Sequence, residues 1–301
     1  MPEIKEVAQN VYLLKVKVPI NVKSVNLYLI DGEVPTLIDA GTNTSNVIEA
    51  VHEGMKYVGI KQLEQVLITH WHVDHAGAAD GFAKEGARIL VGSRDYQEWA
   101  SFIDGKAFER LVEWATQHWG VPEKEISGMT QVFQHFRRLT ALPDEISLIE
   151  PGQLIMAGDS PLQAVLTVGH TAGHMSFYNE KDRLLFPGDM LLPNEIAYPG
   201  VWQEGKQTVS GLPSYLDSLK VIEALNAKNY LPSHGDPQEN PNVRCQEIRE
   251  ELYCRVNKHQ PVESVYLSAL NGNQEIHPGA LYIQLHYAYG WEQLKKKTTV
   301  R

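Results

Sequence analysis

Apolar and polar positions predict that the chain mixes strands and helices up to about residue 92. Strands are expected where β-branched and aromatic residues run together, at residues 11–16, 25–30, 36–41, 66–68 and 88–91. Asp31-Gly32 is a turn signal, so the first three runs predict an antiparallel meander. Apolar residues three and four apart predict a helix over residues 45–58, and a second helix begins near residue 76.

Strand signals vanish over residues 95–142, where aromatic residues such as Trp99, Phe102 and Phe108 recur at helical spacing. We interpret this stretch as a helical insertion that packs on the main domain as a satellite core. Two alternatives stay open, a lid over the substrate and a contact between subunits, because aromatic patches on a surface mark binding sites.

Strand patterns return at residues 153–156, 162–168, 175–178, 183–186 and 230–232, with a helix predicted over residues 212–225. After Pro241 helical spacing takes over, at residues 243–257, 262–270 and 279–292. We therefore predict a main domain over residues 1–237 and a small helical appendage over residues 238–301.

Side chains that can bind a metal follow the predicted strands. Strand 66–68 leads into Thr-His-Trp-His-Val-Asp-His, and three later strands each end beside a glycine and another candidate. The candidate ligands are His70, His72, Asp74, His75, His170, Asp189 and His234. A layered α/β scaffold collects such strand ends on one rim, so we expect one shared site.

Five imidazoles and two carboxylates are too many for one tetrahedral ion and suit two ions. Imidazole nitrogen favours zinc, iron, nickel or copper over magnesium or calcium. Asp39, at the end of an apolar strand, has two readings that the sequence leaves open: a turn former before Gly41, or an acceptor that holds the metal-site backbone or imidazoles in place.

Composition limits the classes of function. The 301 residues carry a net charge of −10, which disfavours a broad nucleic-acid surface. Cys245 and Cys254 would lie about 13 Å apart on a helix, so we expect free thiols and a reducing compartment. The sequence shows neither a signal-peptide pattern nor an apolar run of about 18 residues. We expect a cytoplasmic protein with a small-molecule substrate and no membrane contact.

The motif set resembles the metallo-β-lactamase-fold hydrolases across residues 1–237. The matching pieces are His70-x-His72-x-Asp74-His75, His170 in a Gly-His-Thr loop, Gly188-Asp189, and His234 in a Ser-His-Gly loop. The resemblance implies an αββα four-layer sandwich with the metals between the rims of two sheets. It also implies that His70, His72 and His170 bind one metal, that Asp74, His75 and His234 bind the other, and that Asp189 bridges them.

The implied cofactors are two divalent metal ions, zinc first, with iron or manganese as alternatives. Two ions about 3.5–4 Å apart can share one hydroxide and clamp the reacting group of the substrate. Asp74, close to that hydroxide, would orient it or accept a proton, which makes it the candidate catalytic residue.

Departures from individual branches of the family narrow the choice. Lactonases of this fold place a tyrosine where this chain has Leu192, and the lactamases tend to carry a cysteine at the second metal. The loop from Gly169 to His174 resembles that of hydroxyacylglutathione hydrolases, with Ala172 in place of proline. We predict a hydrolase of small esters or thioesters, in which His174 contacts the site or has a structural role.

Two alternatives remain. The first is the endoribonuclease or phosphodiesterase branch, whose members are of similar size and end in a winged-helix-like tail. The second is a mononuclear iron oxygenase that acts on a persulfide, since that group keeps much of the same motif.

Overall fold

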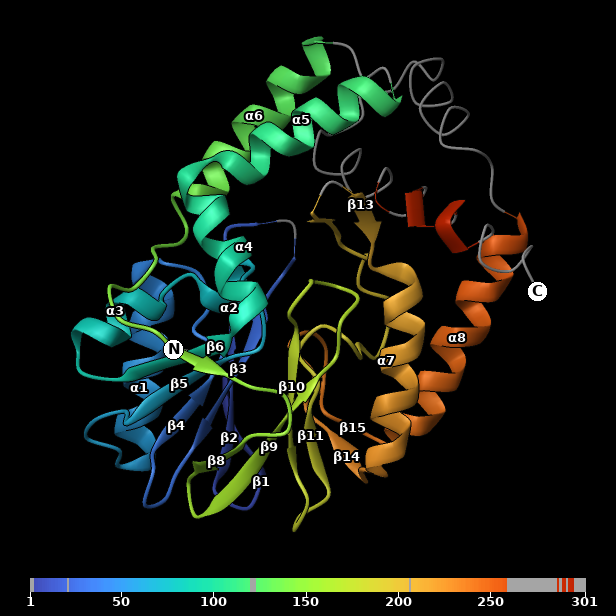
Figure 1. Ribbon diagram of the computed structural model, residues 1–301. Coiled ribbons are helices and arrows are strands. Elements are labelled where there is room, and N and C mark those ends of the chain that lie inside the picture. The colour runs from blue at the N-terminus through green and yellow to red at the C-terminus, as the bar shows by residue number, and fades with distance from the viewer. Residues whose placement is uncertain are drawn as a thin grey trace.

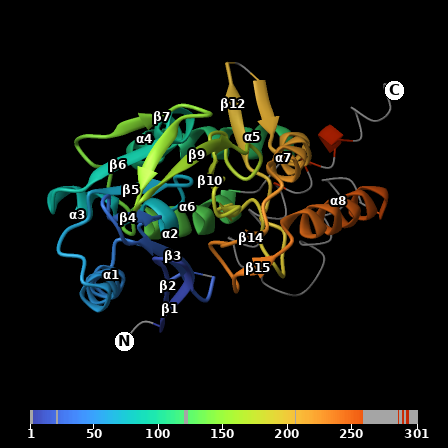
Figure 2. The ribbon, with the colours of Figure 1, turned by 90° about the horizontal axis from the view of Figure 1, so that it is seen from below.

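Two β-sheets packed face to face form the centre of the molecule. The computed structural model describes residues 3–20, 22–119, 123–205, 207–258, 286, 289–290 and 292–294. The two sheets form the inner layers. Helices α1 and α3 cover the outer face of the first sheet, and α7 and α8 cover the outer face of the second (Figures 1 and 2). This arrangement is the αββα sandwich that the resemblance implied.

The first sheet has seven strands in chain order and begins as an antiparallel meander. Its strands are β1 (Glu3–Ala8), β2 (Val11–Val16), β3 (Val25–Ile30), β4 (Thr36–Ile38), β5 (Gln65–Ile68), β6 (Arg88–Gly92) and β7 (Ser147–Ile149). From β4 to β7 all pairs are parallel, which places the carboxyl ends of these strands on one edge. The predicted meander is confirmed, and β1 is a strand that the sequence pattern did not reveal.

The second sheet has six strands in the order β15-β14-β11-β10-β9-β8. These strands are β8 (Leu154–Ala157), β9 (Ser160–Leu166), β10 (Met175–Asn179), β11 (Leu184–Phe186), β14 (Asn229–Tyr230) and β15 (Gln238–Glu239). A separate hairpin, β12 (Val201–Glu204) with β13 (Gln207–Ser210), was not predicted.

Apolar faces hold the four layers together. Leu13, Leu67 and Phe177 belong to a core buried between the two sheets. Helix α1 (Ser45–Val58) buries Val47, Val51 and Met55, one helical stripe, against the outer face of the first sheet. The remaining outer helices are α3 (Ala79–Lys84), α7 (Leu212–Leu225) and α8 (Pro241–Lys258).

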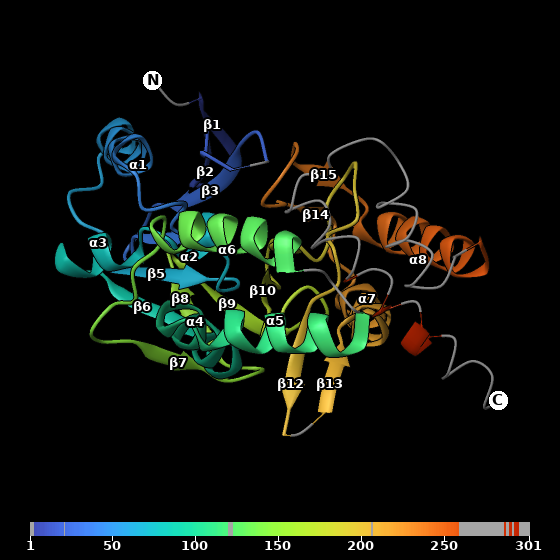
Figure 3. The ribbon, with the colours of Figure 1, turned by 90° about the horizontal axis from the view of Figure 1, so that it is seen from above.

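Helices replace strands after β6, as the aromatic spacing predicted. They are α4 (Ser93–Asp104), α5 (Lys106–Trp119) and α6 (Glu123–Arg137). α5 and α6 form the top of the molecule and extend away from the sheets (Figures 1 and 3). The side chains of Trp114 and Trp119 lie outside the described residues.

The end of the chain is described only in part. Most of the residues in the predicted helices 262–270 and 279–292 lie outside the described residues, so the helical appendage over residues 238–301 and its winged-helix-like form both stay predictions. Tyr289 donates a hydrogen bond to the backbone oxygen of Thr208, and Leu294 is buried in the core formed by α7 and α8. None of the described helices is long and apolar enough to cross a membrane.

Candidate metal centre

The motif after β5 turns its polar side chains inward. β5 is buried along its whole length, and the chain leaves it through Thr69 and His70 in non-helical conformation. His72 then begins the short helix α2 (Val73–Ala76), whose first turn carries Asp74 and His75. This change from extended to helical backbone points His70, His72, Asp74 and His75 to one side.

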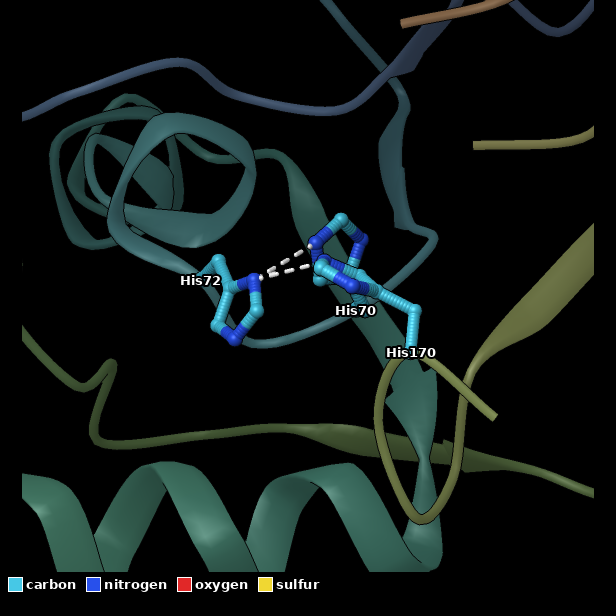
Figure 4. Close-up of side chains that lie close together, drawn as sticks. All are labelled: His70, His72 and His170. Atoms are coloured by element: carbon cyan, nitrogen blue, oxygen red, sulfur yellow. Dashed lines mark hydrogen bonds between the residues drawn. The ribbon is translucent and has the colours of Figure 1, made fainter. Parts of the chain in front are cut away.

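Three imidazoles converge in a first cluster (Figure 4). The Nδ1 atom of His72 lies 3.1 Å from Nε2 of His70 and 2.9 Å from Nε2 of His170. The outer Nδ1 atoms of His70 and His170 are engaged elsewhere, with Thr69 Oγ1 at 3.0 Å and the Tyr198 carbonyl at 2.8 Å. Since the outer nitrogens donate there, the inner ones carry lone pairs. Neighbouring ligand atoms of a tetrahedral zinc ion are about 3.3 Å apart, so the cluster matches that geometry.

Asp74, His75 and His234 form a second cluster of ligand atoms. Asp74 Oδ2 lies 3.5 Å from Nε2 of His75 and 3.3 Å from Nε2 of His234. As in the first cluster, the outer nitrogens are engaged: Nδ1 of His75 with Asp39 at 2.8 Å and Nδ1 of His234 with the Ser24 carbonyl at 2.8 Å. The inner nitrogens of both rings therefore face the carboxylate.

Asp189 lies between the two clusters. Its Oδ2 atom is 3.4 Å from Nε2 of His170 and 4.0 Å from Nε2 of His70. Its Oδ1 atom is 3.6 Å from the Nε2 atoms of both His75 and His234. One carboxylate oxygen thus faces each cluster, the geometry expected of a bridging ligand.

Unpartnered atoms show that this donor set fits metal ions. The Nε2 atoms of His75 and His234 and the Oδ1 atom of Asp189 are buried, and they find no hydrogen-bond partner among the described residues. A buried polar atom without a partner costs about 1–3 kcal/mol. Cations coordinated by these atoms would remove that cost.

The electrostatics of the two clusters differ. Burial lowers the pKa of His70 and His72 well below the usual value, and neighbouring imidazoles lower both further, so the first cluster is neutral. Burial also lowers the pKa of His234, but Asp189 and Asp74 outweigh it and raise that pKa to about 9. Asp74 and Asp189 therefore favour positive charge at the second cluster at neutral pH.

Of the two interpretations of Asp39, the structure supports the hydrogen-bond acceptor. It directly follows β4 with a left-handed backbone, φ +60°, and its carboxylate is buried. The carboxylate accepts hydrogen bonds from the backbone N–H of Thr69 at 2.8 Å and from Nδ1 of His75 at 2.8 Å. It acts as an acceptor that fixes the start of the motif and one ring of the second cluster.

His174 is buried and contacts the site. Its ring stacks on His70 with centroids 5.0 Å apart, and its Nε2 atom accepts a hydrogen bond from the backbone N–H of Asp189 at 3.3 Å. Nδ1 must then carry the proton, which it donates to Thr167 Oγ1 at 2.9 Å. His174 thus has both of the roles that the sequence left open, since it is structural and touches the clusters.

Other histidines and loop residues lie away from the clusters. His52 pairs with Glu85 on the surface, His135 reaches the Pro19 carbonyl, and Asp236 forms an ion pair with Lys15. His118, His259 and His277 lie outside the described residues or side chains. His286 is buried and packs edge-on against the Tyr198 ring, with ring centroids 5.9 Å apart.

Tyr198 and Asp95 are two neighbours of the clusters that the sequence did not reveal. The Tyr198 hydroxyl lies 3.3 Å from the outer nitrogen of His72, and its ring stacks on the His72 ring. Asp95 is fully buried and bonds to loops on both sides of the first cluster. No spacing rule connects either residue to the motif, since the contacts span 126 residues for Tyr198 and 24 to 78 residues for Asp95.

Comparison with known proteins gives one family. A family model described as the metallo-beta-lactamase superfamily matches residues 20–234. The "Probable metallo-hydrolase YqjP" of Bacillus subtilis (strain 168) is 30% identical over 242 residues, 76% of this chain and 72% of that protein. The "Beta-lactamase-like protein 2 homolog" of Caenorhabditis elegans is 25% identical over 219 residues, 72% of this chain and 58% of that protein.

Solved structures share the fold over almost the whole chain. A metallo-beta-lactamase family protein from Thermus thermophilus superposes with a TM-score of 0.79 and 24% identity, covering 97% of this chain and 95% of that one. A beta-lactamase domain protein from Burkholderia ambifaria gives a TM-score of 0.81 at 21% identity, covering 97% and 88%. At these identities the likeness establishes the fold.

Proposed function

The chain belongs to the metallo-β-lactamase superfamily and is a metal-dependent hydrolase, and we propose from that premise that it hydrolyses small esters or thioesters with two metal ions. The observation that carries the proposal is the convergence of seven side chains on one site, where the inner atoms of His75, His234 and Asp189 have no hydrogen-bond partner among the described residues. His70, His72 and His170 would hold one ion, and Asp74, His75 and His234 the other. Asp189 would contact both.

Zinc is the ion that we propose first. Five imidazoles with two carboxylates suit a borderline metal, and iron or manganese would accept the same set. When bound, the ions supply a water of lowered pKa and polarise the carbonyl group of the substrate.

The side chains around the clusters would orient the reacting groups. Burial raises the pKa of Asp74, but His75 and His234 hold it well below its usual range, so Asp74 is ionised at neutral pH. An ionised carboxylate can accept a hydrogen bond from a water or hold a proton released during attack. We therefore keep Asp74 as the candidate catalytic residue.

Two features favour a small ester or thioester. The net charge of −10 would repel a long polyanion such as RNA. The loop from Gly169 to His174 resembles the corresponding loop of hydroxyacylglutathione hydrolases, and here it brings His170 into the first cluster and places His174 against Asp189.

The test joins metal analysis to a substrate screen. We expect two zinc-like ions per chain, and turnover of thioesters or esters that exceeds turnover of lactones, phosphodiesters and short RNA. Asp189→Ala should lose both metal and turnover, whereas Asp217→Ala, on the surface of α7, should keep both. Preferred cleavage of RNA or phosphodiesters would replace this proposal with the nuclease alternative. One iron per chain with oxygen uptake on a persulfide would replace it with the oxygenase.

A further inference from the structure

Asp95 is a buried carboxylate that belongs to neither ligand cluster. It lies in the first turn of α4 and is 0% exposed. Such a group must be compensated by hydrogen bonds, because an ionised carboxylate is costly to remove from water. Its partners show what holds it there.

Three donors surround the carboxylate. Oδ2 accepts from the backbone N–H of Trp71 at 3.1 Å and from the Thr171 hydroxyl at 2.7 Å, and Oδ1 accepts from the backbone N–H of Gly173 at 2.6 Å. Burial raises the pKa of Asp95 to about 7, and these three hydrogen bonds pull in the opposite direction. Because each partner donates, the arrangement suits the ionised form.

The donors come from the two loops that carry the first cluster. Trp71 stands between His70 and His72, in the loop after β5 of the first sheet. Thr171 and Gly173 follow His170, in the loop after β9 of the second sheet. Asp95 therefore links the two loops on which all three imidazoles of the first cluster depend.

Gly173 shows how closely this loop approaches α4. A Cβ atom on Gly173 would lie 2.5 Å from the Asp95 backbone nitrogen and 2.9 Å from its Oδ1 atom. Any side chain at position 173 would push the loop away from α4. The close contact therefore requires both the glycine at position 173 and the carboxylate at position 95.

Asp39 has a similar arrangement at the second cluster, where it contacts Thr69 and Nδ1 of His75. The two buried carboxylates lie at different places in the fold, Asp39 directly after β4 and Asp95 in α4. Asp39 contacts His75 of the second cluster directly and His70 of the first through the Thr69 hydroxyl, whereas the side-chain hydrogen bonds of Asp95 go to the two loops of the first cluster.

We propose that Asp95 is a positioning residue that sets the distance between the His70-x-His72 loop and the His170 loop, and thereby the metal affinity of the first cluster. The proposal rests on the assignment of that cluster as a metal site. Mutating outer partners of metal ligands costs about 10–100-fold in affinity. We expect a loss of that size for the first ion when Asp95 is changed, with the second ion unaffected.

Asp95→Asn is the principal variant. The amide nitrogen of the asparagine would face either the Gly173 N–H or the pair of Trp71 N–H and Thr171 hydroxyl. In either orientation an N–H group of the amide points at another donor, so at least one hydrogen bond is lost. Thr171→Val removes one bond without altering Asp95, and Thr171→Ser restores it. Asp104→Asn is the matched control, because Asp104 ends the same helix on the surface and bonds to Lys106.

Zinc affinity is measured in competition with a chromophoric chelator. The environment of the ion is followed in the absorption spectrum of the cobalt-loaded protein. We expect Asp95→Asn to bind one of two ions about 10–100-fold more weakly with an altered cobalt spectrum. Thr171→Val should shift affinity in the same direction by less, and Thr171→Ser and Asp104→Asn should match the parent.

Three results would overturn the proposal. One is parental zinc affinity in Asp95→Asn or, where that variant does not fold, in Thr171→Val. Another is a fall in melting temperature of the metal-free protein with an unchanged cobalt spectrum. The third is equal weakening of both ions. A parent chain that binds no metal, or a His170→Ala variant with the zinc affinity of the parent, would instead contradict the assignment of the first cluster as a metal site.

Discussion

The outer partner of each imidazole decides which of its ring nitrogens faces the metal centre. His70, His75, His170 and His234 all use Nδ1 for outer hydrogen bonds, which leaves Nε2 facing inward. His72 is reversed, since its Nδ1 faces the cluster and its Nε2 faces the Tyr198 hydroxyl. His72 is also the residue that directly precedes α2, where the backbone changes from extended to helical.

His72→Ala should abolish hydrolysis while the fold survives. The substitution removes the nitrogen that lies between His70 and His170, and the ring is partly exposed, so little core packing is lost. Since losing an outer partner already costs about 10–100-fold, losing the ligand itself should lower activity by at least about 100-fold. Metal content, steady-state rates and far-UV circular dichroism check this together.

His52→Ala is the matched control. That imidazole pairs with Glu85 on the surface, with both side chains 46% exposed, and lies in neither cluster. It should keep parental metal content and rate. Full activity in His72→Ala would remove this residue from the mechanism.

At the scale of elements, a chain of aromatic rings seats α5 and α6 on the metal-binding loop. Trp71 contacts Phe102 of α4 at 5.0 Å between ring centroids, Phe102 contacts Phe133 of α6 at 4.5 Å, and Phe133 contacts Phe108 of α5 at 4.5 Å. Val73 and Leu139 belong to the same small core. These contacts favour the satellite-core interpretation of the insertion over the lid and the subunit contact.

Phe133→Ala should therefore lower stability more than it changes the site. Removing a half-buried aromatic ring that bridges two others should reduce the free energy of unfolding by about 1–3 kcal/mol. Metal content should stay at the parental level, and Gln134→Ala, an exposed neighbour on α6, should change neither. Parental stability combined with a changed preference among substrates would instead favour the lid.

Helix α8 separates the two cysteines of the chain. Both are free thiols, Cys245 buried and Cys254 exposed, as the nine-residue spacing led us to expect. Burial and, to a smaller extent, the nearby Glu223 carboxylate raise the pKa of Cys245 to about 12. The thiolate needed for reaction is therefore scarce at Cys245 near neutral pH.

A thiol titration with an aromatic disulfide reagent at about pH 8 should count one reactive group per folded chain. Two groups should react after unfolding, and Cys254→Ser should leave none in the folded state. Rapid reaction of both thiols in the folded protein would show that α8 does not stay packed on α7.

What the sequence could predict follows from the range of the interactions involved. Local patterns gave α1 and α7 with correct bounds, and strand ends gave the residues that the structure brings together, because parallel strands place their carboxyl ends on one edge. The hairpin β12–β13 was not predicted, because its strands are short and half of their residues are polar. The role of Asp95 could not be predicted, because it depends on hydrogen bonds to Thr171 and Gly173, which are 76 and 78 residues away in the sequence. Only the packing of the two sheets brings these residues together.

At the scale of the whole molecule, the proposed metal centre joins the two sheets. His70, His72, Asp74 and His75 come from the end of β5 in the first sheet. His170, Asp189 and His234 follow β9, β11 and β14 of the second. Each cluster draws from both, so ions bound there would cross-link the layers at their rim, in addition to the apolar core between the sheets.

Removal of the metal should therefore destabilise the whole chain in a single cooperative transition. An ion that binds only the folded state adds about 4 kcal/mol when its free concentration is about 1,000 times Kd. We expect a chelator to lower the melting temperature of the parent chain and added zinc to restore it. The double variant His170→Ala with His234→Ala, which removes a second-sheet ligand from each cluster, should melt at the same temperature with or without chelator, whereas His52→Ala should respond as the parent does. A parent chain whose melting temperature ignores both chelator and zinc would show that the apolar core alone joins the sheets.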